Sequence, residues 1–453
     1  MASPLTLRLP IEADRSLPIL VSVCGAFALS AVSALLAPPL FWVPLALLAI
    51  AAATVLVFRH LAAFCVIWLL IAGATLEMTL GDLVGPSAFQ GTIAAVKFAE
   101  LLLALLCVLR YGPSLDPCNP AFAFLAMFVT GLAHGLYPDL TPAASLRSLL
   151  GSIAPFAFAF SRLSPHWGRA IVRATALVPL LSVAGGAVLD VAGLRPLFVD
   201  LGGARLAGLG HPAFLAGFCL AAIYACLIEL HREGRGRWML LLSANFLILL
   251  LTGARAPLVY GTAVTVLTLG FVRSSVFAMR LRLLPILLAG CLLPLALVLS
   301  HDMPGLRLFQ VLGSGPTNWS GRDLLWPPFQ EAAARSPWFG WGIGAGNAVI
   351  DPDSKLAMLI QAHAAHNEYL RMTVEGGQIG CFLLIALFVL WVVRHTRRLC
   401  PSDKAIMRLA FLAFAAHAYT DNVLIATTAC VFFTFAIGVF ASAPRLMDTG
   451  QVA

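Results

Sequence analysis

Residues 362–393 read AHAAHNEYLRMTVEGGQIGCFLLIALFVLWVV and pass from a polar segment directly into a long apolar run. An apolar run of about 20 residues matches the hydrocarbon thickness of a bilayer. The polar residues His366, Asn367, Glu368 and Tyr369 stand at the start of that run. The stretch therefore predicts a membrane-spanning helix with a cluster of polar side chains at its entry.

The rest of the chain has the same apolar character. Of its 453 residues, 60% are hydrophobic and only 11% are charged, against about 25% charged residues in typical soluble domains. A soluble protein of this size would expose much of that apolar surface to water, at a cost in free energy. The composition therefore predicts a polytopic helical membrane protein.

Fourteen apolar runs of suitable length follow one another along the chain. They lie at about 17–37, 40–58, 61–81, 88–109, 120–137, 144–161, 170–193, 212–230, 237–252, 256–272, 283–300, 368–393, 405–420 and 423–443. We therefore expect an all-α bundle of about 12–14 transmembrane spans. It would comprise a helical region (1–301), one long extracytoplasmic loop (302–367) and C-terminal helices (368–453). Within the loop, GRDLLWPPFQEAAARS (321–336) predicts a short helix.

The distribution of positive charge predicts which loops face the cytoplasm. The formal charge of +8 is carried mostly by arginines, which in membrane proteins gather in cytoplasmic loops, so it does not indicate nucleic-acid binding. With the N-terminus inside, the loops that would be cytoplasmic contain HREGRGR (231–237) and RHTRR (394–398). The alternate loops then include 302–367. We therefore place the long loop outside and interpret the first apolar run as a retained helix.

His366 is the candidate base at this junction. An imidazole titrates near neutral pH and is suited to accept a proton. In an arbitrary membrane protein, a histidine at a helix start is more often a cap or a packed polar group. Here it stands beside Asn367 and Glu368 at the end of the long outer loop. His363 lies three residues earlier and would share a face with His366 in a helix, so spacing leaves the choice between the two histidines open.

Three arginines on the predicted outer side are candidate anion ligands. Arg205 lies in a glycine-rich loop that also contains His211. Arg255 lies at the outer end of a tight helical hairpin, and Arg322 lies in the segment SGRDLLW. A guanidinium binds a pair of phosphate oxygens in bidentate fashion, although it can also snorkel to lipid headgroups or pair with an acid such as Asp323. Together the arginines are placed to converge on one polyanion, for which a lipid diphosphate is the obvious candidate.

Neither metal nor nucleotide chemistry is indicated. The outer acidic residues lack metal-ligand spacing, and the ten cysteines form neither a Cys/His ligand set nor a disulfide framework. The segment WFGWGIGAGN (338–347) is rich in glycine, but no strand precedes it, so it does not fit a dinucleotide-binding loop. We therefore expect no metal and no cofactor.

These features, in this order, resemble the O-antigen ligase and O-antigen polymerase superfamily. The resemblance rests on the SGR…W segment, the PWFGWGIGAGN turn and the HNEYL…EGGQIG helix entry, and it covers about residues 200–390. It implies a metal-independent, inverting glycosyltransferase in the bacterial inner membrane, with its active site facing the periplasm. The donor would be a glycan on undecaprenyl diphosphate, and the acceptor a lipid A-core. Lipopolysaccharide biosynthesis at the cell envelope would be the process served.

The resemblance also implies roles for individual residues. His366 would activate the acceptor hydroxyl. Arg255 and Arg322 would hold the donor diphosphate, with Arg205 in support. The other expected substrate-binding residues are His211, Asn367 and Tyr369. Glu368 stands where the family commonly has a small polar residue, so we expect it either to alter acceptor choice or to orient His366.

Three other functions stay open. A polymerase of O-antigen or exopolysaccharide repeat units would use the same donor and differ only in its acceptor, so it is the first alternative to a ligase. A polysaccharide transporter or flippase would place charged or broken helices at the middle of the bilayer, whereas the polar residues here collect at the outer end. A structural scaffold gives little reason for a histidine and several arginines around one loop.

Overall fold

The computed structural model describes residues 42–201, 203–272, 322–351, 353–360 and 364–443. The chain divides into two compact units, residues 1–64 and 65–453, and each is described by itself. Helix α2 (Trp42–Arg59) belongs to the first unit, and α3 (Leu61–Gly73) begins at its end and continues into the second. All candidate site residues belong to the second unit.

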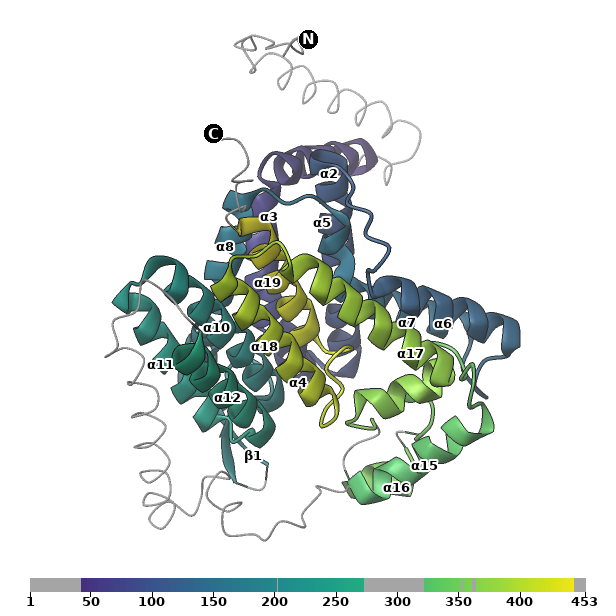
Figure 1. Ribbon diagram of the computed structural model, residues 1–453. Helices are drawn as coiled ribbons and strands as arrows, with labels where there is room; N and C mark the ends of the chain where they lie inside the picture. The colour runs from purple at the N-terminus through teal and green to yellow at the C-terminus, as the bar shows by residue number, and fades with distance from the viewer. Residues whose placement is uncertain (1–41, 202, 273–321, 352, 361–363, 444–453) are drawn as a thin grey trace, which may run out of the picture. The chain divides into compact units, whose positions relative to one another are not determined.

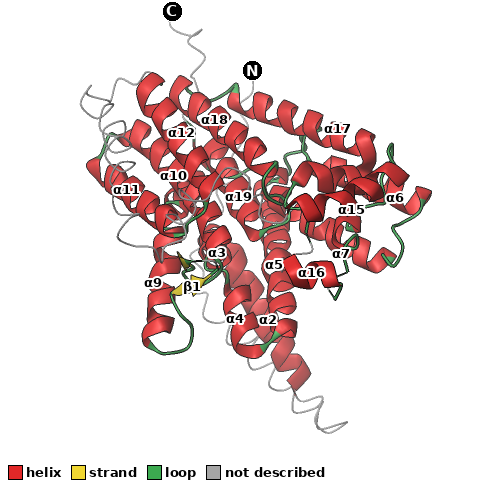
Figure 2. Ribbon diagram, turned by 90° about the horizontal axis from the view of Figure 1, so that it is seen from below, coloured by secondary structure: helices red, strands yellow, loops and turns green. Residues whose placement is uncertain are grey.

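The second unit is almost entirely helical in its described part (Figures 1 and 2). Its helices are α4 (Leu76–Val84), α5 (Pro86–Tyr111), α6 (Ala121–His134), α7 (Pro142–Ile153), η2 (Ala154–Phe160), α8 (Pro165–Thr175), α9 (Val178–Val191), α10 (Pro212–Glu233), α11 (Gly236–Leu251), α12 (Arg255–Phe271), α15 (Arg322–Arg335), η3 (Ala345–Asn347), α16 (Lys355–Ile360), α17 (Glu368–Thr396), α18 (Pro401–Ala418) and α19 (Thr427–Ser442). Two short strands, β1 (Phe198–Asp200) and β2 (Ala204–Leu206), pair antiparallel with Val199 opposite Arg205. The all-α class predicted from the sequence is confirmed.

The helices coincide with the predicted apolar runs. The runs at 17–37 and 283–300 lie outside the described residues, and each of the others matches one helix or two consecutive helices. The run at 170–193 is split into α8 and α9, with Pro179 in the first turn of α9. A proline at that position lacks the N–H that would continue a helical hydrogen bond, so it favours a new helix start.

Several helices are long and apolar enough to cross a membrane. Among the described residues there are four, Ser87–Tyr111, Pro142–Phe160, Pro212–Glu233 and Glu368–Thr396, or up to six if each of two bent pairs is one span. Large apolar side chains remain exposed, including Leu240 and Phe382, each at 73%. Such exposure is unfavourable in water and expected against lipid. A polytopic membrane protein is therefore confirmed, while the total number of spans stays a prediction.

Helix α10 is the centre of the second unit. It packs against α8, α9, α11, α12, α18 and α19, and every residue from Phe218 to His231 is buried. A helix that is apolar on all sides is stable only when neighbours cover it completely. Its position therefore fixes the helices packed around it. The N-cap residue of α10 is His211.

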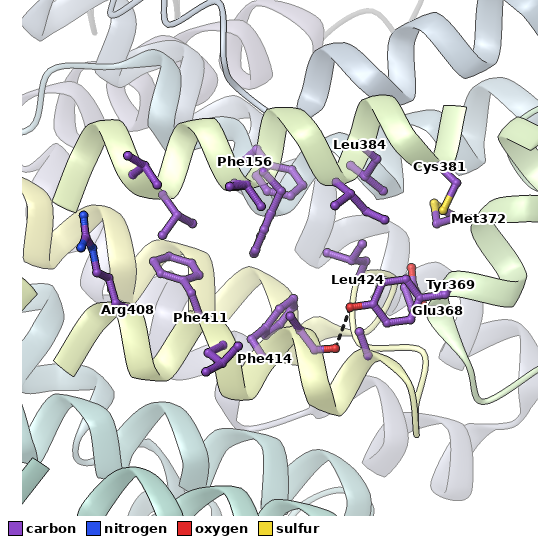
Figure 3. A pocket seen from close by; sticks show the side chains of 18 residues that line it. Phe156, Glu368, Tyr369, Met372, Cys381, Leu384, Arg408, Phe411, Phe414 and Leu424 are labelled. Carbon is purple, nitrogen blue, oxygen red and sulfur yellow. Dashed lines mark hydrogen bonds between the residues drawn. The ribbon is translucent and has the colours of Figure 1, made fainter. Parts of the chain in front are cut away.

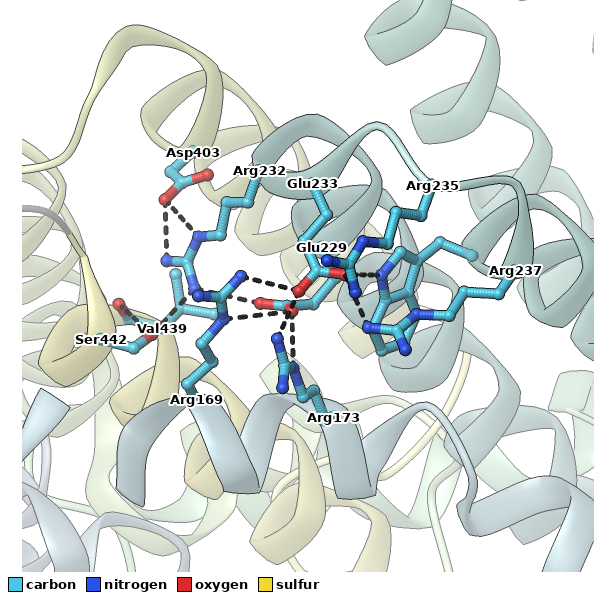
Figure 4. Close-up of polar contacts among 11 residues, drawn as sticks. Arg169, Arg173, Glu229, Arg232, Glu233, Arg235, Arg237, Asp403, Val439 and Ser442 are labelled. Carbon is cyan, nitrogen blue, oxygen red and sulfur yellow. Dashed lines mark hydrogen bonds and ion pairs between the residues drawn. The ribbon is translucent and has the colours of Figure 1, made fainter. Parts of the chain in front are cut away.

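The other end of α10 carries a cluster of ion pairs (Figure 4). Glu229, fully buried, accepts from Arg173 of α8 at 2.9 Å. Arg232 binds Asp403 at the start of α18, with Nη2 2.8 Å from Oδ2. Further members of the cluster are Arg169, Glu233, Arg235, Arg237 and Ser442. The charge pattern assigns these loops to the cytoplasm, and they lie together at one end of the helices.

The polar segment before α17 contains the predicted short helix. Helix α15 (Arg322–Arg335) covers the stretch GRDLLWPPFQEAAARS almost completely. Its buried residues Leu325 and Phe329 pack with Ala365 and Val374. The indole N–H of Trp326 donates to the carbonyl of Ala365 at 2.9 Å. The residue just before His366 is therefore held by α15.

The glycine-rich turn 338–347 docks onto a kink in α17. Gly377 has φ 60° and ψ −166°, which interrupts the helix. The interruption frees the carbonyls of Val374 and Glu375, which accept from the backbone N–H groups of Trp341 and Gly342 at 2.9 Å each. The two motifs that carry the family resemblance therefore lie against one another, and the glycines of the turn have a packing role.

Candidate functional site

The candidate residues gather around one corner of the chain, where α18 ends and α19 begins. We call residues 415–427 the α18–α19 corner. The last carbonyls of a helix have no intrahelical partner, and here side chains from other elements supply one. Tyr369 donates its hydroxyl proton to Ala415 O at 2.8 Å, and Arg322 Nη2 donates to Thr420 O at 2.6 Å. The corner thereby joins α15 and α17.

His366 lies beside this corner in an unusual backbone conformation. Its φ is 47°, in the left-handed region that non-glycine residues rarely adopt, although histidine is among those enriched there. Its Nδ1 is 3.1 Å from Oδ1 of Asp421, and both side chains are half-exposed. When Nδ1–H donates to the carboxylate, Nε2 presents its lone pair to an incoming group. The arrangement is that of an oriented general base.

Asp421 is a member of the candidate site that the sequence analysis did not single out. It lies 55 residues from His366 in the chain. Burial raises the pKa of its carboxyl, but the hydrogen bond and positive charge of His366, with the charge of His417, outweigh burial and hold the pKa below its usual value. Asp421 is therefore ionised at neutral pH.

Glu368 does not orient His366. Its carboxylate is buried and paired with Arg371, which also binds Oε1 of Glu375 through Nη1 at 2.9 Å. Glu368 is thus held inside the α17 side of the structure, and Asp421 takes the orienting position. The alternative base, His363, lies outside the described residues.

Asn367 and Tyr369 hold α17 in place. Asn367 is the N-cap of α17, and its side-chain oxygen accepts from Leu370 N at 3.2 Å. Its backbone N–H donates to Oδ1 of Asn422 at 3.2 Å. Together with the bond from Tyr369 to Ala415, these contacts fix the start of α17 against the corner. Their expected contact with substrate stays a prediction.

The remaining candidates form a second group around β2. Nε of Arg205 donates to Thr252 O at 2.7 Å. Arg255, three residues after Thr252, is the first residue of α12. His211 caps α10, with Nδ1 accepting from Ala213 N at 3.2 Å. Arg205 and Arg255 are thus brought to the same turn, between α11 and α12.

His211 connects the two groups electrostatically. Burial lowers its pKa, and the positive charge of Arg205 lowers it further, as does that of His366, while the negative charge of Asp421 opposes them. Charges from both groups therefore act on one imidazole. The loops that carry these residues are the ones that the charge pattern assigns to a single side of the membrane.

Arg322 retains an unused donor. Its Nη2 is bound to Thr420 O, but its buried Nε has no hydrogen-bond partner among the described residues. A buried donor without a partner costs about 1–3 kcal/mol, and an anion or an ordered water would remove that cost. In the described part of the chain, no three His, Cys, Asp or Glu side chains are grouped as a metal site would require.

An apolar groove between α17 and α18 leads to this site (Figure 3). It has a volume of about 270 Å³ and is lined at one end by Glu368 and Tyr369 and at the other by Arg408. Between these ends the lining is apolar and includes Leu384, Phe411, Phe414 and Leu424. The stretch of α18 from Arg408 to Ala418 spans about 15 Å, at 1.5 Å per residue. The groove is suited to a hydrocarbon chain.

Comparison with protein families gives an independent result. Residues 238–385 match the family model described as O-antigen ligase. This region is similar to the O-antigen ligase family. No curated protein matches the chain. The match supports a glycosyltransferase-like membrane enzyme with lipid-linked glycan substrates in general.

The match to the superfamily covers part of the site. The matched region is about a third of the chain and contains Arg255, Arg322 and His366. Arg205 precedes it and Asp421 follows it, yet Asp421 is in contact with His366 and Arg205 shares a turn with Arg255. The site is therefore completed by residues on both sides of the matched region.

Proposed function

We propose that the protein transfers a glycan from undecaprenyl diphosphate to a lipid A-core acceptor at the outer face of the bacterial inner membrane. The observation that carries the proposal is the pair His366–Asp421, which lies at the same corner as Arg322, while Arg205 and Arg255 form a second group at the turn between α11 and α12. Transfer of a glycan from a diphosphate requires a base for the acceptor proton and cations for the leaving diphosphate. The family match over residues 238–385 supports the same reaction class.

In the proposed reaction His366 takes the acceptor proton. The acceptor hydroxyl attacks the anomeric carbon while its proton passes to Nε2 of His366, and Asp421 stabilises the resulting imidazolium. The bond from the anomeric carbon to the diphosphate oxygen breaks, and its electron pair leaves with the diphosphate. Attack opposite to the leaving group inverts the anomeric configuration. This chemistry requires no metal.

The arginines would bind the departing diphosphate. Arg322 has one guanidinium N–H that is unused among the described residues, and Arg205 and Arg255 meet at a turn of the same unit. Positive charge placed before the reaction is worth most where water is excluded. We assign supporting contacts with the substrate to His211, Asn367 and Tyr369.

The groove between α17 and α18 would take the hydrocarbon chain of a lipid-linked substrate. Its end at Tyr369 lies three residues from His366, and its lining is mainly apolar from there to Arg408 at the other end. A substrate lying there would place its polar head at the base. We likewise propose the division into 1–301, 302–367 and 368–453, with the long middle segment on the periplasmic side.

The experiment that tests this function uses purified protein in liposomes with an undecaprenyl-diphosphate glycan. Transfer that occurs only when lipid A-core is present supports the ligase. Longer lipid-linked chains formed without lipid A-core would replace the ligase by a repeat-unit polymerase. If folded protein consumes no donor under either condition, glycan transfer is refuted and a transporter becomes the better explanation.

A further inference from the structure

Lys97 has an unexpected position in the predicted span formed by α5 (Pro86–Tyr111). A charged ammonium within a membrane span is costly unless it finds polar partners. Its Nζ donates to Ile425 O at 3.0 Å and to Gly151 O at 3.4 Å. Ile425 belongs to the α18–α19 corner and lies four residues after Asp421. Lys97 therefore binds the backbone of the segment that presents the partner of His366.

Glu77 makes a second contact with the same corner. Its side chain is buried in α4, with 1% exposure, and Oε1 accepts from the hydroxyl of Thr427 at 2.9 Å. Its other oxygen, Oε2, is buried without a hydrogen-bond partner among the described residues, and the charge of Lys97 acts on the carboxylate. The second half of the corner is therefore held by the side chains of both Lys97 and Glu77.

Helix α4 also contacts the segment that leads to His211. Thr79, two residues after Glu77, donates its hydroxyl proton to Leu209 O at 2.6 Å. A Cβ added to Gly210 would lie 1.9 Å from Oγ1 of Thr75, so backbone and helix are in close contact there. One short helix thus touches both the segment before His211 and the segment after Asp421.

We propose that Lys97 and Glu77 are positioning residues, which hold the α18–α19 corner so that Asp421 faces His366. This inference rests on the proposed function. Lys97 binds the backbone at Ile425 and Glu77 binds the hydroxyl of Thr427, and both act on Asp421 through these contacts. Displacement of the corner would move the Asp421 carboxylate away from the imidazole and would misplace the base.

Kinetics of glycan transfer test the inference with Lys97→Met, which removes the ammonium and keeps an unbranched chain. We expect kcat to fall about 10-fold with KM unchanged, because small misplacements of a catalytic group cost up to about 10²-fold. Lys97→Arg should restore part of the loss. The matched control is Thr92→Val, since Thr92 of the same helix donates to Ala88 O within that helix. That variant should transfer glycan at the wild-type rate.

A double-mutant comparison separates positioning from general helix packing. In an Asp421→Asn background, Lys97→Met should change kcat less than about 2-fold, because the group it positions has lost its function. Equal losses in the two backgrounds would overturn the inference. A loss that only follows the folded fraction, measured by thermal unfolding, would also overturn it.

A cross-linking measurement tests positioning without any transfer activity. Protein carrying His366→Cys and Asp421→Cys is treated with a short bis-methanethiosulfonate reagent, and the linked peptide is quantified by mass spectrometry. Lys97→Met should lower the cross-linking rate several-fold, whereas Thr92→Val should leave it unchanged. An unchanged rate with Lys97→Met refutes positioning. If wild-type protein transfers no glycan, the proposed function fails, and this rate still decides the geometric claim.

Discussion

Asp421→Asn should slow glycan transfer about 10- to 30-fold. A hydrogen bond to a charged partner is worth about 1.5–3 kcal/mol. His366 and Asp421 are 41% and 37% exposed, so screening by solvent places the expected loss at about 1.4–2 kcal/mol. Each 1.36 kcal/mol corresponds to a factor of about ten in rate. The loss should appear in kcat, because the carboxylate helps most when the imidazole gains a proton.

The asparagine variant is chosen because it preserves the local backbone. Oδ1 of Asp421 also accepts from the N–H of Asn422 at 2.8 Å, and an asparagine retains that acceptor. The matched control is Asp351→Asn, since Asp351 accepts from the N–H of Asp353 at 3.0 Å and is exposed. Transfer is measured in liposomes at saturating donor. Wild-type kcat in Asp421→Asn, with His366→Ala inactive, would refute the orienting role of Asp421.

Three further predictions concern stability. His366→Gly should unfold at a higher temperature than His366→Ala, since glycine relieves about 1 kcal/mol of strain at φ 47°; equal melting temperatures would contradict this. The pKa of His211 is lowered, so the unfolded state binds more protons just below pH 6.5 and wild-type stability should fall there. His211→Asn, which keeps a capping acceptor, should lose less stability between pH 7.5 and 5.5, and an equal loss would argue against it. Arg371→Met leaves two buried carboxylates unpaired and should lower the free energy of unfolding by about 3–5 kcal/mol, measured by denaturant titration; a change below 1 kcal/mol would disagree.

The lengths of the apolar runs were sufficient to predict the membrane helices, and the composition of the polar segment predicted its short helix. Apolar runs of bilayer length specify helices because no other backbone conformation satisfies its own hydrogen bonds in lipid. The stretch 321–336, predicted as a short helix, contains α15. Residue types also identified His366 and Arg322, which lie at the same corner. Both residues belong to the predicted segment 302–367, so one stretch of sequence was enough to single them out.

The partner of His366 was beyond sequence reasoning for a geometric reason. Glu368 is near His366 in sequence, but it falls inside a helix, where a side chain three residues on shares its face. It therefore pairs with Arg371. Asp421 contacts His366 because α17 and the α18–α19 corner pack together. A local sequence pattern does not predict that packing. The capping role of Asn367 could have been predicted from sequence, because asparagine is a preferred N-cap residue.

The most direct test of the account compares wild-type protein with His366→Ala in the same liposomes, under single-turnover conditions with labelled donor and lipid A-core. The quantity measured is the rate at which labelled glycan appears on the core. We expect transfer by the wild type and a rate about 10²- to 10⁴-fold lower in the variant. Equal rates in the two proteins would contradict it.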